Sequence, residues 1–320
     1  MKTFKQIAVA AAITAATLAS GAATAANIAV IAGSEQDGFF NLIKKGVDDA
    51  TLVVKANGGK VNYMRTKNYD NFGPDLANLI NTAASQGVQG IAIPIWVPES
   101  EVPALQAAAK KGIKIMMYNA GADHRESVSG MNYFGSDELV AGQAAGAYMA
   151  KHGAKNILCH IQTPGAVNLE TRCKGVSEGA AKNGAKATIL RVPANLDGNQ
   201  AATAEAIKAE IMKDGTIDAV INLAAWASDA ASTAAKQAGK KLKLGTFDLS
   251  PAVANRIKSG DLTMAIDQQP YLQGFLATSM LAAHIDFGTN ISTEPVLTGP
   301  NIVDATNIDA AVAGIKKGAR

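Results

Sequence analysis

The chain has 320 residues, of which 48% are apolar, 18% charged and 5% aromatic. This composition excludes a disordered or fibrous chain, and the length favours two domains, each with its own core. The formal net charge is +3 and no basic run is present. That argues against nucleic-acid binding, which depends on neutralising phosphates.

Residues 1–25 have the features of a secretory signal peptide. Lys2 and Lys5 supply positive charge, residues 7–18 form a short uncharged apolar run, and residues 23–25 are small, as cleavage requires. A transmembrane anchor is the alternative, but the run is rich in Ala and Thr and shorter than the ~20 apolar residues of a span. We therefore expect a soluble mature protein exported to the periplasm.

From residue 27, short β-rich runs alternate with longer segments of helical periodicity. The first series predicts strands at 27–32, 61–65, 90–93 and 113–118, and helices at 39–57, 71–86 and 99–111. The second series predicts helices at 136–152, 168–183, 200–213, 228–238 and 250–258, and strands at 156–161, 187–192, 217–223 and 242–247. Strands separated by helices predict parallel sheets, and near-continuous apolar strands indicate sheets covered on both faces. We therefore expect two doubly wound α/β lobes.

The two cysteines of the chain, Cys159 and Cys173, lie in one predicted strand and the following helix. An even pair suits an oxidising compartment, so one interpretation is a disulfide. The other is a pair of buried free thiols, since a bond requires Cα atoms within about 7 Å. Neither belongs to a CxxC motif or has a His at ligand spacing, so we expect no zinc site and no other metal.

The loops after the strands hold the candidate site, because ligands of doubly wound sheets bind outside the carboxyl ends of the strands. These loops and the helix starts beside them carry Asp37, Phe39, Phe40, Trp96, Asn119, Asn168, Arg172, Trp226, Asp248 and Gln268. Carboxylates, amides and Arg pair with hydroxyl groups, and apolar walls with a few placed polar groups are typical of small-molecule sites. We therefore predict an uncharged, polyhydroxylated ligand.

Several of these side chains also have a purely structural interpretation. Phe39 and Phe40 could lie on the core side of their helix, and Trp96 could cover the edge of a sheet. Asp248 could be the N-cap of helix 250–258.

The same holds for the remaining polar candidates. Arg172 could form a solvated pair with Glu170, and Gln268 could be a turn residue before Pro270. Because all of these residues fall at strand ends, the binding interpretation is favoured for the set.

The order of several short motifs along the chain resembles that of the periplasmic sugar-binding proteins of ABC transporters, the ribose/galactose-type branch of the type I periplasmic binding proteins. The resemblance rests on residues 28–31 with Phe39 and Phe40, residues 135–138 with Gly142, Arg172 with Gly175, residues 245–248 and residues 267–270. It implies two lobes joined by a three-crossing hinge, near residues 136–137, 268–269 and 297–299. Lobe 1 would comprise residues 26–136 plus 269–297, and lobe 2 residues 137–268 plus 298–320.

The resemblance also implies that the ligand lies between the lobes, with Arg172 and Asp248 holding ring hydroxyls and an aromatic side chain covering the sugar face. Three loops depart from the family pattern, at Asp37-Gly38, Asn119-Ala120 and Ala224-Ala225-Trp226. They put ribose itself in doubt. A different pentose, a hexose, a sugar alcohol and a furanose-like signal molecule stay open, the last on the run at 297–301.

We expect the periplasmic solute-binding component of an ABC importer, which closes around a small sugar or sugar alcohol and delivers it to the inner-membrane permease. The first alternative is a binding protein for a furanose-like signal molecule that acts through a sensor or chemoreceptor. An enzyme is the least favoured class, since no GxGxxG, P-loop, GxSxG or HExxH motif is present. We expect no catalytic residue, no cofactor, no nucleic-acid partner and a monomer.

Overall fold

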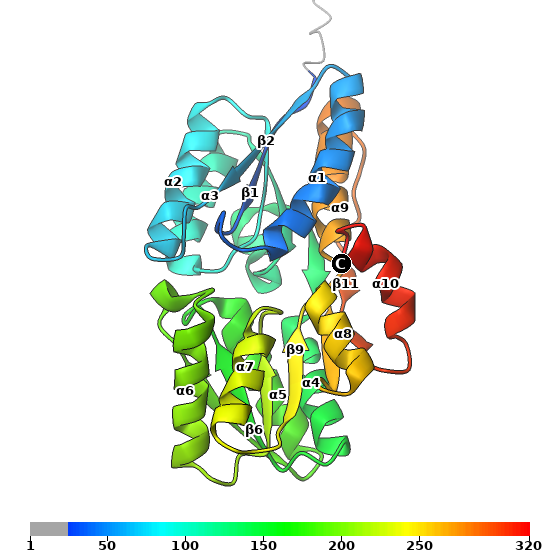
Figure 1. The fold of residues 1–320 in the computed structure, drawn as a ribbon. Coiled ribbons are helices and arrows are strands. Elements are labelled where there is room, and N and C mark those ends of the chain that lie inside the picture. The colour runs from blue at the N-terminus through cyan, green and yellow to red at the C-terminus, as the bar shows by residue number, and fades with distance from the viewer. Residues whose placement is uncertain (1–24) are drawn as a thin grey trace, which may run out of the picture.

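The structure is a computed structural model that describes residues 25–320. Two α/β lobes lie one above the other, each built on one six-stranded sheet (Figure 1). The predicted doubly wound α/β fold is confirmed. The predicted signal peptide lies outside the described residues except for Ala25.

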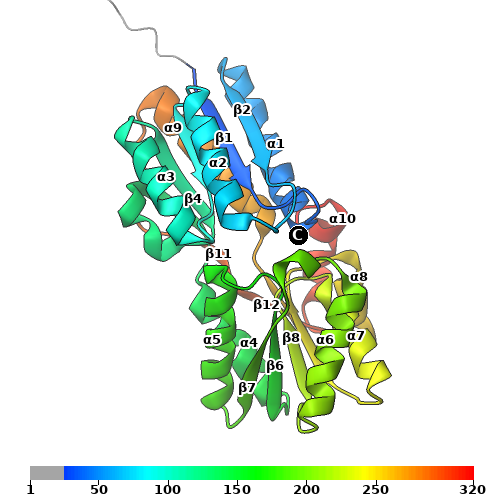
Figure 2. The same ribbon diagram turned by 90° about the vertical axis from the view of Figure 1, so that its left-hand side faces the viewer.

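The upper lobe in Figure 1 contains a sheet of order β11-β5-β4-β3-β1-β2, in which every strand pair is parallel. Its strands are β1 (Asn27–Ala32), β2 (Lys60–Arg65), β3 (Gly90–Ile93), β4 (Lys114–Asn119), β5 (Gly130–Ser136) and β11 (Val296–Gly299). Its helices are α1 (Phe39–Ala56), α2 (Phe72–Ser85), α3 (Pro98–Lys110) and α9 (Pro270–Phe287). The helices cover both faces of the sheet (Figure 2), which explains why β3 is buried along its whole length.

The lower lobe contains a sheet of order β12-β10-β9-β8-β6-β7, in which only β12 runs antiparallel to its neighbour. Its strands are β6 (Asn156–Ile161), β7 (Lys186–Arg191), β8 (Ala219–Asn222), β9 (Lys243–Phe247), β10 (Met264–Asp267) and β12 (Asn301–Val303). Its helices are α4 (Glu138–Lys151), α5 (Val167–Ala181), α6 (Gln200–Lys213), α7 (Ala227–Gln237), α8 (Pro251–Ser259) and α10 (Ile308–Lys316).

The chain passes between the lobes from β5 to α4, from β10 to α9, and from β11 to β12. The second and third crossings are hydrogen-bonded to each other. The Thr298 hydroxyl donates to the Gln268 carbonyl at 2.7 Å, and the Gln269 side-chain amide donates to the Thr298 carbonyl at 2.7 Å. These bonds make the two crossings one connected strip between the lobes.

Most predicted elements lie within a few residues of their observed bounds, but the prediction missed β5 and started the following helix too early. Glycines at positions 130 and 135 and the polar Asn132 interrupt the apolar pattern of β5. The helix begins at Glu138 because the Asp137 side chain caps it, accepting from the Val140 N–H. Also missed were β10, α9, β11, β12 and α10. The apolar residues of α9 are spread over all of its faces, so the helix lacks the one-sided pattern that marks a surface helix.

Candidate ligand-binding site

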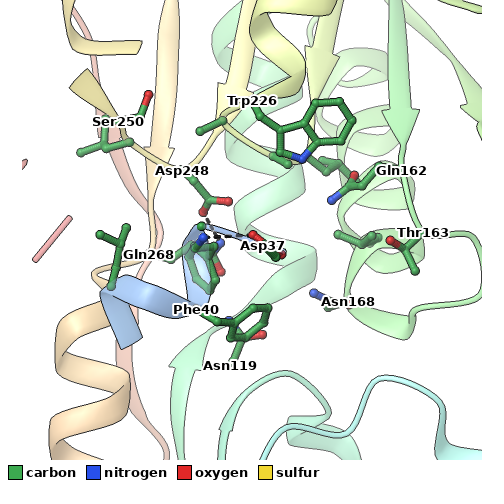
Figure 3. A pocket seen from close by; sticks show the side chains of 18 of the residues that line it. Asp37, Phe40, Asn119, Gln162, Thr163, Asn168, Trp226, Asp248, Ser250 and Gln268 are labelled. Carbon is green, nitrogen blue, oxygen red and sulfur yellow. Dashed lines mark hydrogen bonds between the residues drawn. The ribbon is translucent and has the colours of Figure 1, made fainter. Parts of the chain in front are cut away.

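A cavity of about 580 Å³ lies between the two lobes, within the usual size of small-molecule sites. Every site residue predicted from the sequence lines it: Asp37, Phe39, Phe40, Trp96, Asn119, Asn168, Arg172, Trp226, Asp248 and Gln268. Figure 3 labels seven of them, all but Phe39, Trp96 and Arg172. The lobes touch beside it, where the Val167 N–H at the start of α5 donates to the Trp96 carbonyl at 2.9 Å. The carboxyl ends of strands from both sheets therefore meet around one space between the lobes.

The upper lobe contributes an aromatic cluster to the cavity. Phe40 lies at the centre, edge-to-face with Phe39 at 5.3 Å and with Trp96 at 5.5 Å between ring centroids. Phe72 joins Trp96 at 5.2 Å and Tyr69 at 4.7 Å. Phe40 and Trp96 are buried, so they serve the core and line the cavity at once, whereas Phe39 is only partly buried.

Asp37 and Asn119 are the polar groups of this aromatic lobe. The Asp37 carboxylate accepts from the Phe39 N–H at 2.9 Å and from the Tyr69 hydroxyl at 2.8 Å. Burial raises the pKa of Asp37, although both hydrogen bonds oppose the shift. Asn119 ends β4 with a positive φ of 63° and donates its amide to Gln273 Oε1 at 3.0 Å. Asn is one of the few residue types that tolerate this backbone conformation.

The lower lobe contributes a continuous polar chain that we call the carboxylate network, formed by Glu138, Arg172, Gln268 and Asp248. Arg172 donates to Glu138 through Nε at 2.5 Å and through Nη2 at 3.0 Å. Arg172 Nη2 also donates to Gln268 Oε1 at 2.6 Å, and Gln268 Nε2 donates to Asp248 Oδ1 at 2.5 Å. The Arg172 charge is thereby compensated by Glu138, while no hydrogen bond of Nη1 is found within residues 25–320.

The observed contacts exclude the structural alternatives for Arg172, Gln268 and Asp248. Arg172 does not pair with Glu170, because Glu170 lies at the opposite side of α5 and binds Arg191 at 2.6 Å. Gln268 is more than a turn residue, since its amide joins the two charged groups. Asp248 does not cap helix α8, because the Ser250 hydroxyl accepts from the Val253 N–H there.

Asp248 follows β9 in a left-handed conformation, with a φ of 70°. Non-glycine residues rarely adopt it, and such strain clusters at functional sites. Burial raises the pKa of Asp248 to about 7, against the opposing effects of the Arg172 guanidinium and the Gln268 amide. Both the backbone and the carboxylate are therefore held in a costly state at the cavity wall.

Two features of the sequence position Arg172 on α5. A Cβ atom at Gly142 would collide with the Arg172 carbonyl oxygen, and one at Gly175 with the Leu139 carbonyl, so the glycines let α4 and α5 pack backbone to backbone. This contact brings Glu138 opposite Arg172. Cys159 on β6 and Cys173 on α5 form a disulfide with a Cα–Cα distance of 5.7 Å, which settles the open choice between a bond and free thiols.

A further group of polar side chains lies across the cavity from Asp248 (Figure 3). Gln162 and Thr163 follow β6, and Asn168 lies in the first turn of α5. Trp226, from the loop after β8, lies on the lower-lobe side of the space, and Phe40 lies on the upper-lobe side. A ligand here meets aromatic rings and polar groups from several directions.

Sequence reasoning missed Tyr69, Phe72, Gln162 and Glu138 as parts of the site. Tyr69 and Phe72 lie in or just after the loop that follows β2, and two aromatics in a strand-end loop were a usable signal. Gln162 directly follows β6 and was open to the same argument. Glu138 gave no such signal, because its role depends on a helix contact that only the folded chain shows.

Within residues 25–320, no three His, Cys, Asp or Glu side chains gather in a way that could hold a metal ion. None of the helices in this range has the length and apolar character needed to cross a bilayer.

Comparison with known proteins gives consistent matches. A family model described as a periplasmic binding protein domain matches residues 28–290. A carbohydrate transporter from Acidothermus cellulolyticus 11B, solved in complex with myo-inositol, is 36% identical with a TM-score of 0.85, covering 92% of this chain and 99% of that one. The xylose/arabinose-binding protein XylF of Sulfolobus acidocaldarius is 24% identical over 286 residues, which is 84% of this chain and 69% of the relative.

The fold is also that of a solute-binding protein of an ABC transporter from Burkholderia graminis C4D1M, solved in complex with D-arabinose. That chain is 24% identical, with a TM-score of 0.76, and the match covers 88% of this chain and 96% of that one. At this level of identity the likeness concerns the fold alone.

Proposed function

This chain belongs to the periplasmic binding protein domain family, and from that premise we propose that it captures an uncharged cyclic sugar or polyol between its lobes and delivers it to an ABC permease. It is a sugar-binding protein related to the solute-binding components of ABC transporters. Family members work in the periplasm or outside the cytoplasm. Export of this chain through residues 1–25 is part of the proposal.

The observation that carries the proposal is the carboxylate network facing the aromatic cluster. A sugar ring needs hydrogen-bonding partners around its rim and apolar contact on its faces. Asp248 and Arg172 can accept from and donate to the same ring hydroxyls, and bonds to such charged groups are the strong ones. Phe39 and Phe40 offer the apolar contact from the other lobe.

The charge of the cavity favours a neutral ligand. The Arg172 guanidinium is bound by Glu138, so it does not stand free as an anion receptor. Asp37 and Asp248 face the same space, and both have a raised pKa because of burial. A phosphate ester or sugar acid would add a further negative charge beside these carboxylates.

The role we propose is capture and release without chemical change, by closure of two lobes on a hinge. Two relatives support it, since one is a carbohydrate transporter solved in complex with myo-inositol and the other is a xylose/arabinose-binding protein. The lobes are already in contact through the hydrogen bond between Val167 and Trp96, and the second and third crossings are linked by hydrogen bonds. Both observations support a closed arrangement, which ligand contacts to both lobes would favour.

A thermal-shift screen of the purified mature chain tests the proposal. The probes are D-glucose, D-xylose, L-arabinose and myo-inositol, with myo-inositol 1-phosphate, amino acids and nucleosides as the contrasting set. A ligand at 100 times its Kd adds about 2.7 kcal/mol to the free energy of unfolding. We expect a rise in Tm with at least one neutral sugar or cyclitol and none with the phosphate. A rise confined to the contrasting set would overturn the proposal.

A further inference from the structure

A buried carboxyl group that belongs to no ligand contact lies behind the cavity wall of the upper lobe. Glu101, in the first turn of α3, has no exposed surface and does not line the cavity. Its Oε2 atom accepts from two successive backbone groups, the Trp96 N–H at 2.8 Å and the Val97 N–H at 2.6 Å. Burying a carboxyl group costs free energy unless it is hydrogen-bonded, and here both bonds go to the segment that presents Trp96 to the cavity.

The peptide group between Trp96 and Val97 is held by hydrogen bonds from both sides. Its N–H, which belongs to Val97, donates to Glu101, and its carbonyl, which belongs to Trp96, accepts from the Val167 N–H at 2.9 Å. Glu101 and Trp96 belong to the upper lobe, whereas Val167 is the first residue of α5 in the lower lobe. Hydrogen bonds that run through one peptide group polarise each other, so the bond to Glu101 makes the Trp96 carbonyl a better acceptor for Val167.

The start of α5 has no side-chain cap of its own. The first N–H groups of a helix lack partners within the helix, and the residue before Val167 is Ala166, whose side chain cannot accept a hydrogen bond. The Trp96 carbonyl takes this role from the other lobe, at the end of α5 that faces the upper lobe (Figure 2). Since the donor and the acceptor belong to different lobes, separation of the lobes would break this bond.

We propose that the Trp96–Val97 peptide is a latch between the lobes and that Glu101 is its positioning residue, which holds the carbonyl toward the Val167 N–H and thereby stabilises the closed form. The inference rests on the proposed function, since it takes capture by lobe closure as given. Glu101 acts on the balance between open and closed forms and not on the ligand. Its effect on affinity should therefore be the same for every ligand that closure captures.

Two substitutions break the latch from its two ends. Glu101→Met keeps the length of the side chain and removes the acceptor, whereas Glu101→Gln keeps an acceptor oxygen. Val167→Pro removes the N–H with little other change, because proline is favoured at the first position of a helix. Ala166 before it has a φ of −71° and a ψ of 115°, which suits a residue that precedes proline. Glu99→Met is the matched control, since Glu99 is exposed in the same turn of α3.

Calorimetric titration with myo-inositol, D-glucose, D-xylose and L-arabinose measures the Kd of each variant. We expect Glu101→Met and Val167→Pro each to weaken binding about fivefold, as the loss of one hydrogen bond implies, and by one factor for every probe that wild-type protein binds. Glu101→Gln and Glu99→Met should stay close to wild type. The double variant should bind about as weakly as Glu101→Met alone, because both substitutions remove the same interaction.

Thermal unfolding of the free proteins checks that the variants fold. If Glu101→Met does not fold, Val167→Pro carries the test, since it leaves Glu101 and its two hydrogen bonds in place. A folded Val167→Pro variant that binds every probe as wild type does would overturn the inference, and so would additive losses in the double variant. Either result leaves the proposed function standing, because binding persists. Wild-type protein that binds none of the four probes would instead remove the proposed function, and the latch with it.

Discussion

The two lobes have nearly the same topology but contribute opposite chemistry to the cavity between them. The upper lobe presents a cluster of rings around Phe40, with Asp37 and Asn119 as its polar groups. The lower lobe presents the carboxylate network at one end and Gln162, Thr163 and Asn168 at the other, with Trp226 as its aromatic member. Two sheets of nearly the same topology therefore present different side-chain chemistry to the cavity.

The two kinds of contact differ in how strongly they depend on the positions of the ligand hydroxyls. Aromatic contacts with the C–H faces of a ring depend little on which hydroxyl stands where. Hydrogen bonds to a fixed network depend on it strongly, because a missing partner leaves a buried polar group unsatisfied. We therefore expect substitutions in the upper lobe to change affinity for all ligands alike, and those in the lower lobe to change selectivity.

The largest effect is expected from Arg172→Met, which breaks the network at its centre. Glu138 would then be buried without its cation, and breaking a buried pair in this way costs about 3–5 kcal/mol of unfolding free energy. Binding should weaken by about 1.5–3 kcal/mol as well, the range for hydrogen bonds to charged groups. Denaturant unfolding and calorimetry measure the two losses.

Arg191→Met is the matched control, since Arg191 pairs with Glu170 on the surface of the same lobe. Exposed pairs contribute about 0–1 kcal/mol, so both measurements should change little. Equal effects of the two substitutions would show that the network has no special role.

The fold followed from the sequence more readily than the pairing of the site residues did. Asp37, Asp248 and Trp226 all line the cavity because strand ends of a parallel sheet meet at one edge, a rule that needs only the order of the elements. The Glu138–Arg172 pair was not found. It depends on two helices touching at Gly142 and Gly175, and such a contact leaves no periodic signal in the chain.

Removing the disulfide should affect the lower lobe alone. The bond closes a loop with a sequence separation of 14, for which chain entropy gives about 3 kcal/mol. In the Cys159→Ala/Cys173→Ala variant, hydrogen exchange should accelerate in β6 and α5, while β1 in the upper lobe keeps its protection. Equal acceleration in both lobes would mean that they unfold as one unit.

Asp248→Asn should reduce affinity and change the pH dependence of stability. The folded-state pKa of about 7 lies above the ordinary value of 3.8, so the folded protein holds this proton more tightly than the unfolded chain does. The stability that results is fully present below pH 3.8 and is lost as pH rises through 7. Asp248→Asn has no carboxylate to ionise and therefore does not lose this stability. The Tm of the variant minus the Tm of wild type should be more positive at pH 8 than at pH 5.

Affinity should move the other way, because the ionised Asp248 is the better acceptor for a ring hydroxyl. We expect Asp248→Asn to bind about 1.5–3 kcal/mol more weakly at pH 8, with a smaller difference at pH 5. The control is Asp261→Asn on the exposed surface of the same lobe. A wild-type affinity that does not fall below pH 7 would contradict this assignment.

The smallest effect is expected from Phe39→Ala in the upper lobe. Its partly buried ring offers contact area, and its loss should weaken binding by about 1 kcal/mol. The loss should be the same for every sugar or cyclitol that binds, unlike the losses expected in the carboxylate network. Phe287→Ala, which is 67% exposed and outside the cavity, should change nothing. A loss that differs between ligands would contradict the claim that the upper lobe affects affinity and the lower lobe selectivity.

The most direct test of the account uses the two tryptophans of the chain, because Trp96 and Trp226 line this one cavity from opposite lobes. Intrinsic fluorescence is followed while myo-inositol, D-xylose and D-glucose are titrated, with calorimetry on the same samples. We predict that each ligand that binds produces a saturable change in tryptophan emission with the calorimetric Kd, and that Trp226→Phe removes part of it. Calorimetric binding with no change in emission would show that the ligand binds outside the space between the lobes.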